Sequence, residues 1–461
     1  MTDSNCPATE DAPDQKQRHE TELIQWLRIP SISSYPDHKD DTARAGQWLL
    51  DKFQRAGLKT QWLPTDGHPI VLAETPPVPG APVALVYGHY DVQPAEPLDL
   101  WTTPPFEPTV RDGNLYARGS TDDKGQLLTH VHSVCDWITS GESLPLQVKF
   151  LVEGEEEVGS QNLEARLSDL ADQLACDCVV ISDSGQYADG QPAITYGLRG
   201  IATYEIEVQG PAMDLHSGSF GGAVANPAVA ICHLISSMFD ETGKICISGF
   251  YDDVRPIDAD ERERWKQLPQ DESEFAKSIG VDQLFGEPGY TADERRWARP
   301  TLEVNGLTSG HQGEGVKTII PAVAKAKISC RLVPDQDPGK ITAAIQAHID
   351  ANTIPGTRVT LKADHGAPAM LANTDSPYMA AAAEAIRTGF GVSPVLIREG
   401  GSIPIVAEFQ NVLRCDCLLL GWGLSDDNAH SPDEKFRLAD FHRGIAASRE
   451  LWKQLGQCRV G

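Results

Sequence analysis

The stretch Val83-Ala-Leu-Val-Tyr-Gly-His-Tyr-Asp91 decides how the rest of the chain can fold. It begins as a continuous apolar run, which is typical of a buried strand, and it ends in His89 and Asp91. A strand buried on both faces accommodates an imidazole and a carboxylate only at its open end, and sites in doubly wound α/β sheets gather at the carboxyl ends of strands. The pair is typical of a metal-ligating histidine with a carboxylate partner. Because an ordinary loop gives the same pattern, this pair alone does not establish a site.

Two further apolar runs end in acidic side chains. Residues 146–152 lead into the run of glutamates at 155–157, and residues 178–182 end at Asp183. Between them, Asp122 and Asp123 stand at the start of a predicted helix, where carboxylates also complement the helix dipole. A run of three glutamates is often a solvated helix face, but after a buried strand the three charges repel one another unless a cation compensates them. Together these strand ends predict a cation site.

Composition limits the class of protein. The chain has 461 residues, 40% of them hydrophobic and 23% charged, as in a globular protein large enough for two domains. No apolar run approaches the ~20 residues of a membrane span. The net charge of −27 argues against nucleic acid or an anionic membrane as partner, because both require a basic patch. The first twenty residues are polar and have no signal-peptide core, so we expect a cytoplasmic protein with a loose tail over residues 1 to about 18.

The order of the predicted elements indicates an interrupted domain. Residues 1–196 and 369–461 alternate strands and helices, which is typical of an α/β domain with helices flanking a central sheet. Residues 197–368 begin with a composition shift and contain two strand groups and two helices, as in an inserted α+β domain. The predicted fold is therefore an α/β domain with a mixed central sheet flanked by helices, interrupted by a smaller inserted α+β domain.

Two Cys-x-Cys pairs, Cys176/Cys178 and Cys415/Cys417, could together form a zinc tetrad. Both pairs fall on apolar strands, where a spacing of two residues puts two small side chains on one face. We therefore predict that they pack in the interior.

The side chains at the strand ends suit a catalytic metal site. The candidates are His89, Asp122 or Asp123, one or two of Glu155, Glu156 and Glu157, Asp183, and His430. Imidazole and oxygen donors without thiolates favour Zn, Mn or Co in a catalytic role. If one aspartate bridges two ions, five residues supply three bonds to each ion and one glutamate is left as a general base. Two-metal hydrolases have this arrangement, with ions ~3.5–4 Å apart.

The motifs GHYDV, RGSTDDKG, EGEEEVGS, ISDSG, ITYGLRG, DLHSGSFGG, KTIIP, RLVPDQ, REGGSIP and NAHSPDE occur in this order. In this respect the chain resembles the co-catalytic zinc metallopeptidase family, which contains aminoacylases, glutamate carboxypeptidases and carnosinase-like cytosolic dipeptidases. The resemblance covers nearly the whole chain. ITYGLRG, the stretch GFYDDV at 249–254 and the long segment 240–300 are most similar to the dipeptidase branch.

The resemblance implies specific roles for the metal-site residues. His89, Asp122 and Asp183 would bind one ion, and Asp122, Glu157 and His430 the other. Glu156 would be the general base, and Asp91 would support His89. The cofactors would be two divalent ions per chain, zinc first, with manganese or cobalt as alternatives. Spacing alone did not distinguish the base from the ligand among the glutamates.

The resemblance also implies substrate-binding roles for His216, Thr318, Arg331 and Ser402. Arg331 would hold the free carboxylate of the substrate in a bidentate fork, although a surface arginine is common in an alternating strand. His216 would donate to the oxyanion of the tetrahedral intermediate, although a turn residue fits a glycine-rich loop equally well. The insert would be a lid and dimerisation domain, and pairing of two inserts would carry His216 into the partner's site.

The predicted function is hydrolysis of dipeptides or short peptides with a free C-terminal carboxylate by a metal-bridging hydroxide. Glu156 would take the proton of the water and return it to the leaving amine. An N-acyl-amino-acid deacylase of the same mechanism is one alternative, and a non-catalytic dimeric binding homologue is another.

Overall fold

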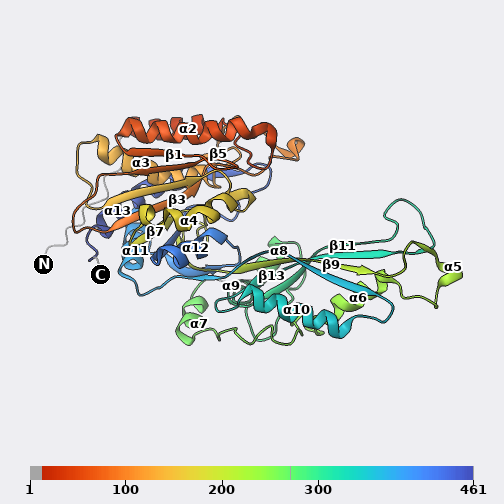
Figure 1. Cartoon of the computed structure of the whole chain (residues 1–461). Helices are drawn as coiled ribbons and strands as arrows, with labels where there is room; N and C mark the ends of the chain where they lie inside the picture. Colours follow the sequence, from red (N-terminus) through yellow and green to blue (C-terminus); the bar gives the residue numbers. More distant parts are fainter. Residues whose placement is uncertain (1–12, 270, 460–461) are drawn as a thin grey trace. The chain divides into compact units, whose positions relative to one another are not determined.

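The computed structural model describes residues 13–269 and 271–459, and they form two compact units (Figure 1). Unit 1 comprises the described residues up to Tyr196, Ala372–Ile397 and those from Glu408 onward, and unit 2 comprises Gly197–Leu371 and Arg398–Ala407. The sequence placed the boundaries at 196/197 and 368/369. Residues 398–407, which the sequence placed with the catalytic part, group with unit 2 in the structure.

Most strands of a nine-stranded sheet belong to unit 1, and the order of the sheet is β1-β2-β6-β3-β7-β17-β8-β15, with β16 paired to β8. Its strands are β1 (Lys59–Leu63), β2 (Ile70–Glu74), β3 (Val83–His89), β6 (Gln147–Glu153), β7 (Cys178–Ile181), β8 (Ala193–Leu198), β15 (Met370–Leu371), β16 (Val395–Glu399) and β17 (Asp416–Gly421). β3 runs parallel to β6 and β7, and β17 runs parallel to β7, whereas the pairs β1–β2, β2–β6, β17–β8 and β15–β8 are antiparallel. The predicted mixed central sheet is confirmed.

Helices cover both faces of this sheet. Val86 on β3 lies opposite Phe150 on β6, and Phe150 contacts Phe53 of α2 with ring centroids 4.7 Å apart. The next residue of β3, Tyr87, points to the other face because side chains alternate along a strand, and there it contacts Phe409 of α12 at 5.1 Å. The helices of this part of the chain are α1 (Pro13–Leu27), α2 (Lys39–Ala56), α3 (Lys124–Thr139), α4 (Gln161–Leu174), α11 (Pro377–Phe390), α12 (Pro404–Leu413) and α13 (Leu438–Leu455).

The N-terminal helix corrects one expectation from the sequence. Residues 13–18, predicted as part of a loose tail, are helical, and residues 1–12 of that tail lie outside the described residues. The buried residues of α1 are His19, Leu23, Trp26 and Leu27, which recur at helical spacing. The first turn of α1 carries no large apolar residue, so hydrophobic periodicity does not predict a helix there. In the described part of the chain, no helix has the length and apolar character needed to cross a membrane.

A small antiparallel sheet in unit 1 joins two segments that are far apart in sequence. β5 (Asn114–Tyr116) lies between β4 (Thr109–Arg111) and β18 (Lys435–Arg437). The pairing brings Lys435 opposite Tyr116. The segment that precedes α3 therefore lies beside the segment that precedes α13. Short 3-10 helices η1 (Pro36–His38), η2 (Leu98–Leu100) and η3 (Glu156–Val158) complete the unit.

Unit 2 is built on a four-stranded antiparallel sheet in the order β11-β13-β9-β14. Alternate residues of β9 and β13 are buried, and their buried face packs with Ile231 and Leu234 of α6 and Ile345 of α10 in one hydrophobic core. The unit contains β9 (Gly200–Gln209), β10 (Leu215–His216), α5 (Ser217–Phe220), α6 (Pro227–Ser237), α7 (Ala259–Lys266), α8 (Glu272–Ser278), α9 (Ala292–Ala298), β11 (Thr301–Ser309), β12 (Ile319–Ile320), β13 (Val323–Leu332), α10 (Pro338–Asn352) and β14 (Arg358–Ala367). The α+β character predicted for the insert is present.

Candidate metal centre

Most candidate ligands of unit 1 follow the carboxyl ends of neighbouring parallel strands, whereas Asp122 lies just before α3. His89 is the last residue of β3, and the glutamates at 155–157 follow β6 directly. Asp183 follows β7, and His430 lies in the segment after β17. Because β6, β3, β7 and β17 are parallel, or linked through parallel neighbours, these ends meet at one edge of the sheet. This is the edge at which α/β folds place their sites.

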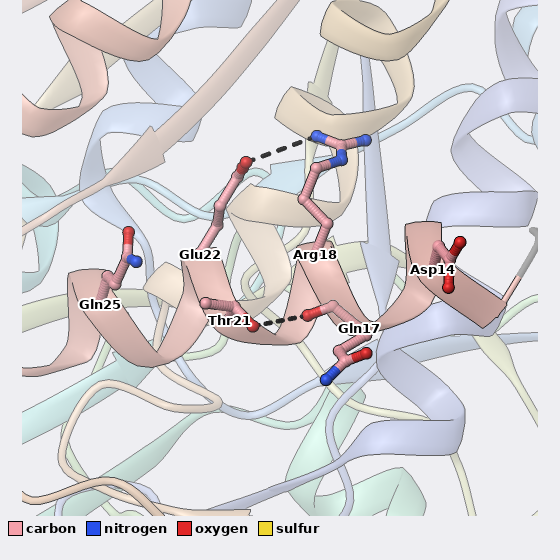
Figure 2. Close-up of a pocket in the computed structure, with 6 residues that line it drawn as sticks. All are labelled: Asp14, Gln17, Arg18, Thr21, Glu22 and Gln25. Atoms are coloured by element: carbon pink, nitrogen blue, oxygen red, sulfur yellow. Dashed lines mark hydrogen bonds and ion pairs between the residues drawn. The ribbon is translucent and has the colours of Figure 1, made fainter.

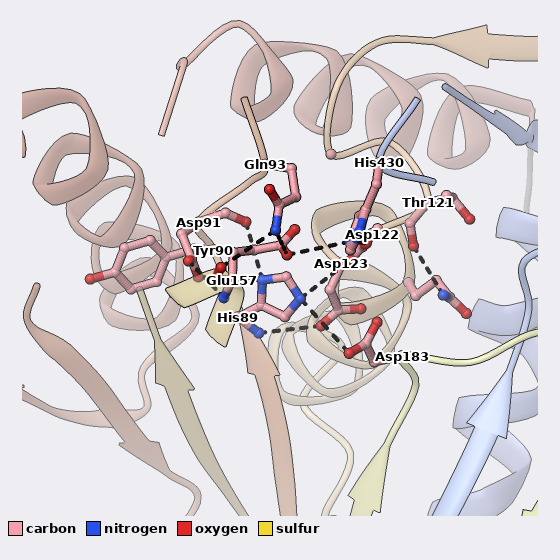
Figure 3. A network of polar contacts seen from close by, with 12 residues as sticks. His89, Tyr90, Asp91, Gln93, Thr121, Asp122, Asp123, Glu157, Asp183 and His430 are labelled. Carbon is pink, nitrogen blue, oxygen red and sulfur yellow. Dashed lines mark hydrogen bonds and ion pairs between the residues drawn. The ribbon is translucent and has the colours of Figure 1, made fainter. Parts of the chain in front are cut away.

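A first group of ligand atoms comes from His89, Asp122 and Asp183, all within 4.8 Å of one another. Nε2 of His89 lies 3.2 Å from Oδ1 of Asp122 and 3.9 Å from Oδ2 of Asp183. His89 is fully buried, and Figure 3 shows its imidazole pointing toward the two carboxylates. This nitrogen makes no hydrogen bond, although buried imidazole nitrogens normally have a partner.

A second group comes from Asp122, Glu157 and His430, again within 4.8 Å. Nε2 of His430 lies 2.8 Å from Oδ2 of Asp122 and 3.3 Å from Oε2 of Glu157 (Figure 3). The two carboxylate oxygens of Asp122 thus face two different histidines. Such a shared carboxylate is what a bridging ligand between two cations requires.

The neighbouring acids Asp123 and Glu155 belong to neither group and make other contacts. Oδ2 of Asp123 accepts a hydrogen bond from the backbone N–H of His89 at 3.3 Å. The carboxylate of Glu155 accepts from Nδ2 of Asn162 at 2.8 and 3.0 Å. Of the adjacent acids, Asp122 and Glu157 are the ones that join the groups. The peptide bond between Asp122 and Asp123 is cis.

Electrostatics at this edge favour a cation. Burial opposes charge on His89, yet its contacts with Asp122 and Asp91 raise its pKa well above the usual range. Hydrogen bonds to Asp122 and Glu157 raise the pKa of His430 to about 10. Burial alone would raise the pKa of Asp122, but His430 and His89 hold it well below its usual range. The carboxylates give the site a negative potential, which favours protonated imidazoles at His89 and His430. A divalent ion could replace those protons and bind the same side chains.

Glu156 lies between these ligands in sequence but belongs to neither group. Burial, followed by the carboxylates of Asp183, Glu157 and Asp122, raises its pKa well above the usual range, although His89 opposes this. A carboxylate beside a cation site with a raised proton affinity can accept a proton from water.

A model of peptidase family M20/M25/M40 matches residues 85–454 of the chain. The chain belongs to this family. Beta-Ala-His dipeptidase of Homo sapiens is 32% identical over 462 residues, which cover 95% of this chain and 91% of the relative. Cys-Gly metallodipeptidase DUG1 of Saccharomyces cerevisiae is 35% identical over 445 residues, which cover 92% of each chain. An M20 family metallo-carboxypeptidase from Sulfolobus solfataricus has a similar structure, with a TM-score of 0.86 and 32% identity over 95% of this chain and 99% of its own.

Family membership confirms that this M20/M25/M40 peptidase is a metal-dependent hydrolytic enzyme. It also confirms the resemblance to the dipeptidase branch that the motifs indicated. The alternative of a non-catalytic binding protein is therefore set aside.

Asp91 and Gln93 contact candidate ligands of the peptidase. Nδ1 of His89 lies 3.1 Å from the backbone oxygen of Asp91 and 3.4 Å from its Oδ1, so the carbonyl is the closer partner. Oδ2 of Asp91 accepts from the backbone N–H of Glu157 at 3.2 Å. Gln93 was missed in the sequence, and its Nε2 donates to Oε2 of Glu157 at 2.8 Å. It lies four residues after His89, just beyond the motif that was quoted.

A third group of metal-ligating side chains, His19, His132 and Asp136, connects α1 to α3. Its surroundings differ from those of the first two groups. Arg18 pairs with Asp136 at 2.6 Å. Glu22, which lies 3.7 Å from Nδ1 of His132, pairs with Lys52. Cationic side chains therefore already compensate both carboxylates. The surface pocket along α1 in Figure 2 contains Arg18 and Glu22 and none of the candidate metal ligands. Burial and then Lys52 hold the pKa of His132 well below its usual range. Within the group, His19 contacts Asp136 at 2.7 Å, and we interpret this contact as a connection between α1 and α3 rather than part of a cation site.

The four predicted substrate residues lie in unit 2. Nη1 of Arg331 donates to Oγ of Ser402 at 2.8 Å. His216 on β10 pairs with Ile319 on β12, and the backbone oxygen of Thr318 accepts from the N–H of Ser217 at 3.0 Å. The structure thus brings Arg331 beside Ser402, and His216 beside Thr318. His216 is exposed, and its Nδ1 accepts from the backbone N–H of Gly218 at 3.0 Å.

Arg199 is a further residue that sequence reasoning missed. Its Nε donates to the backbone oxygen of Gly400 at 3.1 Å, and Oγ of Ser402 donates to the backbone oxygen of Arg199. Burial, followed by the charges of Arg331 and Arg296, lowers the pKa of Arg199 to about 10. Arg199 and Arg331 both hydrogen-bond with Ser402, and an anionic ligand would offset two positive charges gathered around one serine. Arg199 belongs to the motif ITYGLRG, which could have identified it as a candidate site residue.

Cys178 and Cys417 lie on the neighbouring parallel strands β7 and β17, whereas Cys176 and Cys415 just precede these strands. Cys178 and Cys417 are buried, and Sγ of Cys176 lies 3.6 Å from Sγ of Cys415. Among the described residues, no metal-ligating group includes a cysteine. The interior packing predicted for the pairs is present for Cys178 and Cys417, whereas Cys176 and Cys415 are half-buried.

Proposed function

We propose that this peptidase hydrolyses dipeptides or short peptides with a free C-terminal carboxylate, using two divalent ions bound to the two groups that share Asp122. One ion would be held by His89, Asp122 and Asp183, and the other by Asp122, Glu157 and His430. The observation that carries the proposal is that the two oxygens of Asp122 face histidines of different groups. Zinc is the first choice for both positions, and manganese or cobalt suits the same donors.

When bound, the ions would supply Lewis acidity, which polarises the scissile carbonyl and acidifies water. The residues of the chain would do the rest. Glu156 would accept a proton from the attacking water and return it to the leaving amine. Asp91 would hold the tautomer and orientation of His89 from behind. Gln93 and the backbone contacts of Asp91 would keep Glu157 in place.

Dipeptides are the proposed substrates because two similar relatives are named for them. One is named for β-alanyl-histidine and the other for cysteinyl-glycine. Such substrates end in a carboxylate, which Arg331 would bind as a fork. Thr318 and Ser402 would contact the same part of the substrate, and His216 would donate to the oxyanion.

A homodimer is the proposed assembly, formed through unit 2. Val229 on α6 is 62% exposed, and Phe220 and Val224, just before that helix, are also exposed. Pairing two copies about a two-fold axis would bury these apolar side chains. A cytoplasmic location stays a prediction of the sequence.

One experiment tests the proposed function. The purified chain, stripped with a chelator, is supplied in turn with Zn, Mn and Co and assayed on β-alanyl-histidine, cysteinyl-glycine and matched N-acetyl amino acids. We expect metal-dependent hydrolysis of the dipeptides and weak turnover of the N-acyl compounds. Preference for the N-acyl compounds would instead make the chain a deacylase.

A further inference from the structure

Glu434 is a fully buried carboxylate that lies between two segments carrying metal ligands. It ends the motif NAHSPDE, four residues after His430, and its side chain contacts the turn that carries Asp122. Nothing in the mechanism above uses it. A buried carboxylate is costly unless it is well paired, so its contacts indicate its role.

Both oxygens of Glu434 accept hydrogen bonds from the turn at 118–122. Oε2 accepts from Nη1 of Arg118 at 2.6 Å and from the backbone N–H of Gly119 at 3.0 Å. Oε1 accepts from the backbone N–H of Thr121 at 3.0 Å and from that of Asp122 at 3.3 Å. A single side chain thus fixes the backbone immediately before and at the shared ligand.

The segment that carries His430 needs such an anchor. Asn428, His430 and Asp433 all have positive φ, of 57°, 62° and 56°. Non-glycine residues in this left-handed region carry a cost and persist where the surroundings hold them. The backbone oxygen of Glu434 accepts from the N–H of Ala117 at 3.1 Å, which continues the pairing of β18 with β5 toward the site.

A second contact joins the same two segments. Oγ1 of Thr121 donates to Oδ2 of Asp427 at 3.1 Å, and the same oxygen accepts from the backbone N–H of Leu424 at 2.8 Å. The turn at 118–122 and the segment 424–434 are therefore held together at two points, one on each side of His430 in sequence.

We propose that Glu434 is a positioning residue that holds Asp122 and His430 in register, so that the two converge on one ion. The inference rests on the proposed function, because it takes those two residues to be ligands. Asp122 belongs to both groups and His430 to one. Loosening the contact between their segments would therefore weaken binding at both positions, and most at the position that contains His430.

The variant Glu434→Gln tests this with little change in shape. Because both oxygens of Glu434 accept from N–H donors, a glutamine places its own NH₂ group against a donor whichever way the amide is turned. It also leaves the guanidinium of Arg118, 1% exposed, without its charged partner. The variant Glu434→Asp keeps the charge for Arg118 but shortens the side chain by one methylene, so that its oxygens cannot reach all four donors.

Asp433→Asn is the matched control. Asp433 lies one residue earlier in the same segment, but its Oδ1 and Oδ2 accept from the backbone N–H and Oγ1 of Thr102 and not from the turn at 118–122. The control therefore changes a carboxylate of the same loop and leaves the contact with Asp122 unchanged.

The measurement is the affinity of each folded variant for Zn and Co, by competition with a chelator, together with circular dichroism and the absorption spectrum of the cobalt form. We expect Glu434→Gln and Glu434→Asp to lose about 10- to 100-fold in affinity, as residues that orient metal ligands do, and Asp433→Asn to lose less than about threefold. The cobalt spectrum should change in the two Glu434 variants and not in the control.

A purely structural Glu434 would lower the unfolding temperature and leave the affinity of the folded protein unchanged, and that result would overturn the inference. Equal losses in Asp433→Asn would overturn it as well. If Glu434→Gln does not fold, Glu434→Asp decides the outcome because it keeps the buried ion pair. A wild-type chain that binds no divalent ion would overturn the proposed function itself, whereas two bound ions with unaffected variants would overturn only the role of Glu434.

Discussion

Nη1 of Arg331 donates a 2.8 Å hydrogen bond to Oγ of Ser402, which lies 71 positions later in the chain. Both were expected to bind substrate, although the sequence placed one in the insert and the other in the catalytic part. In the structure both belong to unit 2. Ser402 also donates to the backbone of Arg199, so the two arginines share one hydroxyl-bearing neighbour.

This arrangement predicts the effect of removing the guanidinium of Arg331. If it binds the carboxylate of the substrate, Arg331→Ala should raise KM for free dipeptides about 10- to 100-fold, which corresponds to the loss of a charge-assisted fork. The KM for C-terminally amidated dipeptides, which offer no carboxylate, should change little. Steady-state kinetics on matched pairs of free and amidated substrates give the answer.

Arg331→Lys is the informative control, because one ammonium cannot make the bidentate pair. We expect it to behave much like the alanine variant. Equal effects of Arg331→Ala on free and amidated substrates would remove Arg331 from the substrate site.

The same Glu→Gln change at positions 156 and 157 should have two different effects, one on the catalytic rate and one on metal content. Glu157 lies 3.3 Å from Nε2 of His430, whereas Glu156 is outside both groups of ligands. Glu156→Gln should therefore lower kcat by about 10²- to 10⁴-fold, the range for loss of a general base, while metal content stays at two ions per chain. Glu157→Gln should lower metal content instead. Elemental analysis after dialysis separates the two, and loss of metal from Glu156→Gln would show that the roles are reversed.

The sequence predicted the large sheet and the His, Asp and Glu side chains that gather at its edge because each signal was local. A single short stretch shows both the buried strand, as an apolar run, and the polar residues that end it, such as His89 or the glutamates after β6. The convergence of three such ends then follows from the parallel order of the strands. The family motifs supplied what spacing could not, namely which glutamate is outside the ligand groups.

The supporting contacts were not predictable in the same way. Glu434 meets Arg118 across 316 residues, and no local pattern tells a buried acceptor from a surface glutamate. The group around His19 likewise shows that long-range contacts decide the role of a side chain. Its three donors satisfy a geometric criterion for a metal site, and only the positions of Arg18 and Lys52 show that the charges are already balanced.

That group gives a prediction about pH and stability. His132 is fully buried, and burial, then Lys52, His19 and Arg18, hold its pKa well below the usual 6.5. The unfolded chain therefore binds a proton near pH 6.5 that the folded chain does not, so the free energy of unfolding falls as pH drops below that value. His132→Phe removes this proton and keeps the aromatic contact with Phe441 at 5.9 Å. Between pH 8 and pH 5 the variant should lose about 2 kcal/mol less than the wild type.

Urea unfolding of both proteins at the two pH values, in the presence of a chelator, measures this difference without a contribution from metal release. His130, whose pKa burial lowers to about 3, and Asp136, whose pKa His19 and Arg18 hold well below its usual range against the effect of burial, are unchanged in the variant. Their contributions cancel in the comparison. Parallel pH dependences for the two proteins would mean that His132 takes up its proton in the folded state as well.

The last prediction concerns the proposed homodimer. His216 belongs to unit 2 and is exposed, and all of the candidate metal ligands belong to unit 1. If the dimer carries His216 into the site of the other copy, His216→Ala and Glu156→Gln homodimers are each inactive for different reasons. A mixed dimer would then hold one site with both defects and one site with neither, because the two changed residues meet in the same site.

Mixing the two inactive variants under conditions of subunit exchange should therefore restore activity toward half of the wild-type value per mixed dimer. Differently tagged chains allow the mixed species to be isolated and its fraction measured. The control is a mixture of Glu156→Gln with Glu157→Gln: both residues lie in unit 1, so each site keeps one defect and no activity should return. If exchange is demonstrated and the His216 mixture stays inactive, His216 acts within its own chain or has no part in the reaction.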